Sequence, residues 1–137
     1  MTSKLLCAGH AAFDQRFAEI VARALRGDWQ DLEAAWAAFA DDVVSHFDYE
    51  EREIFADYAD EAAEHAGPAA ELWADHTALR EILGQLAQEV AAQRVREGTV
   101  EMFVTRLRAH SEREDATIYA WLERRRGTQL RRDRAAT

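Results

Sequence analysis

The sequence contains a single cysteine, a single proline and no long hydrophobic run. Cys7 cannot form a disulfide within the chain, and such scarcity is typical of reducing compartments, so we expect a cytoplasmic location. No apolar run approaches the roughly 20 residues that cross a bilayer, and the apolar patch in the first ten residues is too short for a secretory signal. The 137 residues indicate one globular domain that can bury a core without disulfides.

Charge is unevenly distributed along the chain. The formal net charge is −9, which argues against a nucleic-acid partner. Residues 1–123 carry 25 acidic and 11 basic side chains, whereas residues 124–137 carry six arginines and one aspartate. We expect a domain over residues 1–123 and a basic C-terminal tail over residues 124–137 that is frayed and solvated. An arm that binds an acidic partner is the alternative for this tail, and the sequence identifies no protein partner.

Apolar residues recur every three or four positions along four stretches, which predicts four helices. These stretches are residues 6–24, 29–54, 72–90 and 100–121. The first helix should end at Gly27, the second before Gly67-Pro68 and the third at Gly98, with Asp28 as the N-cap of the second. No window alternates with the period of two that is typical of a strand. The expected fold is all-α, an up-down-up-down four-helix bundle.

Histidines interrupt the apolar stripe once on each predicted helix, at His10, His46, His76 and His110. Glu50 and Glu114 follow two of them at i+4, which places each glutamate on the same helix face as its histidine. In antiparallel helices, two residues lie at one height when the turn falls midway between them. The midpoint of the first two histidines is residue 28, beside Gly27, and that of the last two is residue 93, near Gly98. We expect all six side chains to converge on one level of the bundle.

Six such groups are costly to bury without partners, because each buried charge costs several kcal/mol. One or two divalent cations would reverse that cost. Imidazole nitrogens with carboxylate oxygens suit iron and, less exclusively, zinc, manganese or copper. Four histidines and two glutamates are a natural count for two metals, with two histidines on each metal and both glutamates bridging. A lone buried histidine is more often a hydrogen-bonded core residue, but four at one level favour a metal site.

The order His…His-x-x-x-Glu…His…His-x-x-x-Glu resembles the hemerythrin-like domain, also called the HHE cation-binding domain, over roughly residues 5–123. The resemblance implies a four-helix bundle around a non-haem di-iron centre, whose cofactor is two iron ions with an oxo or hydroxo bridge. It implies terminal ligands at His10, His46, His76 and His110, and bridging carboxylates at Glu50 and Glu114. By the same analogy, the first two helices serve one iron and the last two serve the other.

The sequence departs from oxygen-carrying hemerythrins at two points. Those proteins have a further histidine four residues after the first one on the third helix, where this chain has Arg80. They also use an aspartate five residues after the last histidine, the position of Asp115 here. Glu114 lies at i+4 and stays on the stripe with Leu107 and Trp121, so we expect Glu114 to be the ligand. Four histidines leave one more position for solvent or a carboxylate, which argues against simple reversible oxygen carriage.

The resemblance implies a protein that binds a small ligand, such as O2, NO or peroxide, at this His4Glu2 site for sensing, scavenging or storage. The ligand would contact the metals in a pocket walled by four rings, those of Phe13, Phe17, Phe39 and Phe103. A di-iron enzyme of the peroxidase or oxidase type and an iron-buffering protein are the alternatives. The sequence does not separate them, because the reaction depends on open coordination positions and on access.

Several residues near the expected site are assigned lesser roles. Asp14, at i+4 from His10, is either an acceptor for an imidazole N–H or a plain surface carboxylate. Glu51 and Glu53 are expected to be solvated, with Glu53 the better spare ligand because i+3 from the stripe keeps it near that face. Tyr119 could donate to the bridge or carry a radical, but core packing or partial exposure is the expected role. His65 is expected to be solvated or to cap a helix end.

Overall fold

The chain folds into helices alone over residues 3–136, the part whose backbone the computed structural model describes; side chains are described for residues 10–135. The α-helices are α1 (Ser3–Leu25), α2 (Leu32–Glu50), α3 (Ala56–Glu61), α4 (Ala66–Ala91), α5 (Glu97–Glu114) and α6 (Ala120–Ala136). A π-helical turn, η1 (Glu51–Phe55), joins α2 to α3, and a second, η3 (Asp115–Tyr119), joins α5 to α6; a short 3-10 turn, η2 (Ala63–His65), precedes α4. The described residues contain no strand, which confirms the all-α prediction.

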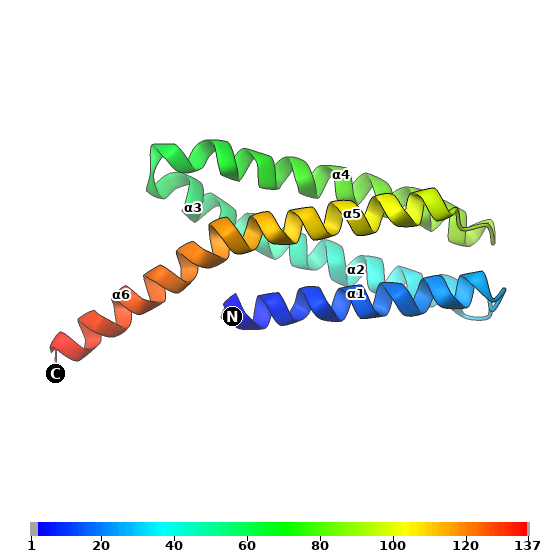
Figure 1. The fold of residues 1–137 in the computed structure, drawn as a ribbon, viewed down its shortest axis with the longest axis horizontal. Helices are drawn as coiled ribbons and strands as arrows, with labels where there is room; N and C mark the ends of the chain where they lie inside the picture. Colours follow the sequence, from blue (N-terminus) through cyan, green and yellow to red (C-terminus); the bar gives the residue numbers. More distant parts are fainter. Residues whose placement is uncertain (1–2, 137) are drawn as a thin grey trace.

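Four antiparallel rods make up the fold: α1, α2 with η1 and α3, α4, and α5 with η3 and α6 (Figure 1). Each rod packs against the next along the chain, α1 on α2, α2 on α4 and α4 on α5, and α1 closes the ring against α5. Short connections between antiparallel neighbours produce this order. The expected up-down-up-down four-helix bundle is therefore confirmed.

The turns between rods differ from the sequence prediction in detail. Gly27 ends α1 as predicted, at a φ of 72°, with the amide of Asp28 donating to the carbonyl of Arg23. This pattern is the Schellman motif, which favours glycine. Asp28 does not cap the next helix, because α2 begins only at Leu32. The carboxylate of Asp28 instead pairs with the side chain of Arg23.

The turn after α4 uses glutamine where glycine was expected. The amide of Arg94 donates to the carbonyl of Glu89 across Gln93, which has a φ of 55°. The prediction that Gly98 ends this helix is wrong, because Gly98 lies in the first turn of α5. Gly67 and Pro68 likewise lie in the first turn of α4. Proline is tolerated there because the backbone N–H groups of a first turn have no acceptor within the helix. The preceding rod ends at the extended residue Ala62, before this pair as predicted.

Two separate apolar clusters form the core, and the polar stripe residues lie between them along the rods. The larger cluster, near the α1–α2 and α4–α5 turns, includes Phe17, Phe39 and Phe103. The smaller one, around η1 and η3, includes Phe55 and Ile118. On α5, for example, His110 and Glu114 follow Leu107 of the larger cluster and precede Ile118 of the smaller. The fold therefore places one polar layer across the bundle interior.

The C-terminal segment is a helix rather than a frayed tail. Trp121 is buried against Tyr58, and Arg125 lies over its ring at 4.7 Å. Beyond that point α6 projects past the bundle and its side chains are almost all exposed, so the prediction of a frayed end is wrong although that of solvation holds (Figure 1). No helix in the described part of the chain is long and apolar enough to span a membrane.

Candidate metal centre

The structure brings the four histidines and two glutamates of the apolar stripe, here called the six stripe residues, together at one level of the bundle. His10 comes from α1, His46 and Glu50 from α2, His76 from α4, and His110 and Glu114 from α5. Their ligand atoms form two groups that could each hold a metal, one of His10, His46 and Glu50 and one of Glu50, His76, His110 and Glu114. The second group is buried, whereas the side chains of His10 and His46 keep 14% and 11% exposure. The centre therefore has a closed end and a slightly open end.

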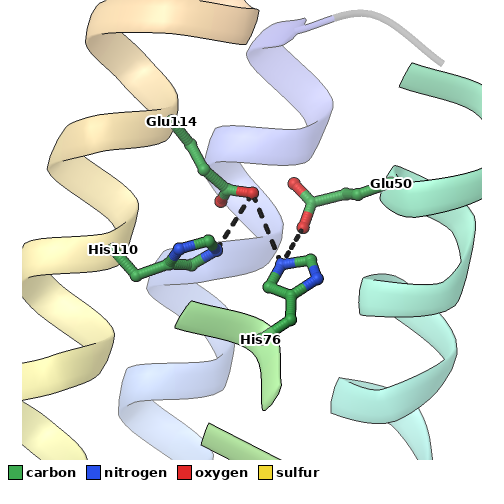
Figure 2. A group of neighbouring side chains, drawn as sticks. All are labelled: Glu50, His76, His110 and Glu114. Carbon is green, nitrogen blue, oxygen red and sulfur yellow. Dashed lines mark ion pairs between the residues drawn. The ribbon is translucent and has the colours of Figure 1, made fainter. Parts of the chain in front are cut away.

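Each glutamate divides its two oxygens between the two pairs of histidines. Glu50 places Oε2 at 3.4 Å from Nε2 of His46 and Oε1 at 3.2 Å from Nε2 of His76. Glu114 places Oε1 at 3.3 Å from Nε2 of His10. Its Oε2 lies 3.1 Å from Nε2 of His110, and this contact is drawn in Figure 2. Both carboxylates thus lie between a first histidine pair from α1 and α2 and a second pair from α4 and α5.

Buried atoms at the centre lack hydrogen-bond partners. They are Nε2 of His76 and of His110, Oε1 of Glu50 and both oxygens of Glu114. Nδ1 of His76 faces Glu51 at 3.0 Å and Nδ1 of His110 faces Asp75 at 3.0 Å. A carboxylate only accepts, so each Nδ1 carries the imidazole proton and each Nε2 points a bare lone pair at a glutamate oxygen. When both glutamates are ionised, lone pairs face lone pairs in this buried layer; a cation satisfies them, and this donor set fits one.

Ionisation of the buried groups follows from their surroundings. Burial raises the pKa of Glu114 well above its ordinary value, and the nearby carboxylate of Glu50 raises it further. Burial also acts to raise the pKa of Glu50, but the adjacent imidazoles of His46 and His76 outweigh it and hold that pKa far below its ordinary value. Burial and the neighbouring His76 lower the pKa of His110 to about 4. His110 is therefore neutral at pH 7, the form that binds metals.

Two relays of a carboxylate and an arginine support the second histidine pair. Glu51 accepts from Nδ1 of His76 and also pairs with Arg80 at 2.5 Å. Asp75, which accepts from Nδ1 of His110, takes two hydrogen bonds from the guanidinium of Arg113, at 2.7 and 2.9 Å. The hydrogen bonds of Arg113 hold the pKa of Asp75 below its ordinary value although burial acts to raise it. Such outer partners fix the ring orientation of a histidine.

These relays correct the prediction for the residues beside Glu50. Glu51 and Glu53 were both expected to be solvated, with Glu53 the better spare ligand. Glu53 is exposed as expected and pairs with the neighbouring Arg52, but Glu51 is partly buried and contacts His76. The π-helical turn η1 begins at Glu51 and changes the phase on which the i+3 expectation depended. Asp75 was missed altogether. The only feature of the sequence that could have pointed to Asp75 was its position directly before His76.

Both π-helical turns begin directly after a glutamate of the centre, η1 after Glu50 and η3 after Glu114. The wider turn brings two consecutive residues onto the core side, Ile54 with Phe55 and Ile118 with Tyr119. Single-turn π-helices are frequent at functional sites. A search for an unbroken period of 3.6 residues cannot reveal π-helical turns, so the predicted apolar stripe included Thr117. In the structure the Thr117 hydroxyl donates to the backbone carbonyl of Arg113.

Tyr119 does more than pack in the core. Its hydroxyl donates to Oε2 of Glu50, one of the two oxygens facing the first histidine pair. This position follows from η3, which turns a residue at i+5 from Glu114 into the interior. Tyr119 is buried in the smaller apolar cluster, so the expected core packing is confirmed, and its hydroxyl in addition contacts a glutamate of the centre. His65 lies apart from the centre, stacks on the ring of Tyr58 at 4.0 Å and faces the carbonyl oxygen of that residue.

The remaining carboxylates near the stripe lie on the outside. Asp115 is exposed and Glu114 is buried, with Nε2 of His110 at 3.1 Å from Glu114. This arrangement agrees with the preference for Glu114, although which of the two binds a metal stays a prediction. Asp14 is exposed on α1, from where its negative charge acts to raise the pKa of His10.

The four phenylalanines expected to wall a pocket fill the interior instead. The ring of Phe17 lies 4.6 Å from that of Phe103 and 5.9 Å from that of Phe39, centre to centre. Phe13 alone among them contacts the centre, edge-on to His46 at 5.5 Å. On the closed end, Phe47 stacks on His76 at 4.0 Å. Phe13 and Phe47 therefore cover His46 and His76 with apolar surface.

A comparison with known protein families agrees with this geometry. The family model described as the hemerythrin HHE cation binding domain matches residues 2–122, nearly the whole chain. No curated protein and no solved structure matches the chain at a significant level. The matched stretch contains all six stripe residues and both relays.

Proposed function

The chain belongs to the hemerythrin HHE cation-binding domain family, and we propose that its polar layer holds two iron ions and binds a small ligand such as O2, NO or peroxide there. One observation carries this proposal. Glu50 and Glu114 each divide their oxygens between two histidine pairs, which is the arrangement that two bridged metals require. One metal would need only one such oxygen from each carboxylate.

The donor set supports iron as the metal. His10 and His46 would hold one ion and His76 and His110 the other, with Glu50 and Glu114 shared between them. Imidazole and carboxylate suit iron, and among the side chains described for residues 10–135 the layer consists of histidines and glutamates alone. Two nitrogens and two oxygens for each ion leave positions free, and iron with free positions supplies redox and ligand-binding chemistry.

The protein's own groups determine what can react. The buried rings of Phe47 and Phe55 against His76 exclude water from the closed end. A ligand of two or three atoms could approach on the side of His10 and His46, whose side chains are partly exposed. Beside that approach, the Tyr119 hydroxyl donates a hydrogen bond to Glu50. Sensing, scavenging and storage all need this small-ligand binding, while a peroxidase or oxidase would also need repeated turnover.

Metal content is the direct test of the proposal. Protein purified from cells without added metal should carry about two irons per chain by elemental analysis. His76→Ala should lose metal, because its Nε2 has no other partner. His65→Ala is the matched control and should keep both irons, since His65 contacts Tyr58 rather than the centre. One zinc per chain, or unchanged iron in His76→Ala, contradicts the proposal.

Turnover separates the binder from its alternatives. Mixing the iron-loaded protein with peroxide and an excess electron donor should consume about one equivalent per site if the protein only binds or scavenges. Sustained consumption would identify the peroxidase alternative, and rapid loss of all iron to a mild chelator would favour buffering.

A further inference from the structure

The two ends of the centre are supported unequally. His76 and His110 each donate from Nδ1 to a carboxylate, Glu51 or Asp75, and each carboxylate is itself bound by an arginine. Among the side chains described, no carboxylate lies within ion-pair distance of Nδ1 of His10 or of His46. The rings of the first pair contact each other instead, edge-on at 5.0 Å with their Nε2 atoms 3.1 Å apart, and His46 also meets the edge of Phe13.

Burial follows the same division. His76 and His110 are closed off from solvent, and aromatic rings cover His76 on both faces, Phe47 at 4.0 Å and Phe55 at 4.9 Å. His10 and His46 form the end that solvent can reach. Water and chelators must displace a ligand atom to remove a metal, so access and ring mobility both favour loss from the open end.

We infer that the centre holds its two metals unequally, with the Glu51–Arg80 and Asp75–Arg113 relays making the His76–His110 end the retentive one. Glu51 and Asp75 are positioning residues, since they touch the imidazoles and not the metals. A carboxylate on Nδ1 fixes the tautomer, orients Nε2 and raises its basicity, and loss of such a partner typically costs 10–100-fold in metal affinity. This inference rests on the proposed two-iron function and adds an order of release to it.

Arg80 has a particular part in this scheme. It stands where oxygen-carrying hemerythrins have a further histidine, and here its guanidinium reaches Glu51 and Asp48 on the neighbouring rod. The residue thus contributes to the His76 end indirectly, by holding the acceptor of its N–H. Arg113 acts in the same way for His110: both residues lie on α5, and Asp75 on α4 connects them.

Release kinetics test the inference. The full chain is loaded with ferrous iron without oxygen and mixed with an excess of a coloured ferrous chelator, and bound iron is followed by absorbance. The wild type should release iron in two phases, each about half of the total. His10→Ala should lose the fast half and keep about one slowly released iron per chain. The double variant Glu51→Gln with Asp75→Asn should speed the slow phase by roughly 10–100-fold and leave the fast phase unchanged.

A structural control separates positioning from simple helix pairing, because both relays are also ion pairs between rods. Asp42→Asn breaks a different pair between rods, with Arg16 at 2.8 Å, and should leave both phases unchanged. Thermal midpoints of the metal-free variants measure the purely structural loss.

One phase for both irons, an unchanged slow phase in the double variant, or equal acceleration by Asp42→Asn would overturn the inference while leaving the two-iron proposal standing. A wild type that binds no iron would overturn both.

Discussion

Replacing Glu114 with glutamine should have opposite effects on stability and on metal binding. Glu114 is fully buried beside Glu50, and its pKa in the folded chain lies well above the ordinary 4.5. The unfolded chain therefore loses the Glu114 proton first as the pH rises. The stability that this group contributes is fully present below pH 4.5 and is lost as the pH rises toward the pKa of the folded state. Glutamine imitates the protonated form at every pH and avoids this loss.

The magnitude follows from proton linkage. In the range between the ordinary and the raised pKa, the metal-free wild type should lose about 1.4 kcal/mol of unfolding free energy per pH unit relative to Glu114→Gln. For each pH unit within that range, the difference between the two melting temperatures should grow by about 3–5 °C for a domain of this size. The variant should also lose most of its iron, because an amide cannot bridge two metals as a carboxylate does.

The assay is thermal unfolding followed by helical circular dichroism, with a chelator present, at pH 5.5, 6.5 and 7.5. Asp115→Asn is the matched control, since it removes the neighbouring, exposed carboxylate. We expect Asp115→Asn to follow the wild-type pH profile and to keep its iron. Parallel profiles for Glu114→Gln and the wild type would refute the reasoning about the buried pair. Greater metal loss in Asp115→Asn would move the ligand to that position.

Three further predictions concern single features of the fold. Truncation after Glu123 should leave the iron content unchanged while lowering the helical signal, because the rest of α6 is exposed; loss of iron would make α6 part of the site. Tyr119→Phe should lower the unfolding free energy by about 1.5–3 kcal/mol in urea titrations, since it removes a buried hydrogen bond to Glu50, and an unchanged midpoint would mean that this bond is not made in solution. Gln93→Gly should raise the unfolding free energy by about 1 kcal/mol, because glycine relieves the left-handed φ of 55°; destabilisation would contradict that account.

Much of the centre was predictable because helix periodicity places side chains with little help from tertiary structure. A histidine and a glutamate at i+4 must share a face, and a turn midway between two histidines must bring them to one height. These two rules predicted that His10, His46, His76 and His110 meet Glu50 and Glu114, and the structure brings them together. Gly27 was recognisable for a similar local reason, because it has the left-handed φ that ends a helix.

Other local signals were ambiguous. Gly98 was the predicted end of the third rod, because glycine has the highest propensity for that position. The chain uses Gln93 because the Schellman hydrogen bond from Arg94 to Glu89 stabilises the turn there. The composition of the arginine-rich end also predicted a frayed, solvated tail. In the structure, residues 124–136 belong to α6, which continues from α5 through the π-helical turn η3.

The sequence by itself determined the four rods, the polar layer and the identity of its six residues, because all three depend on spacing along single helices. Only the tertiary structure decided what surrounds that layer. The partners of Nδ1, Glu51 and Asp75, come from rods other than those of His76 and His110, so no spacing within one helix could reveal them. The two π-helical turns and the unequal exposure of the two histidine pairs likewise arise from packing between rods, where the interior must be filled and each buried donor must find an acceptor.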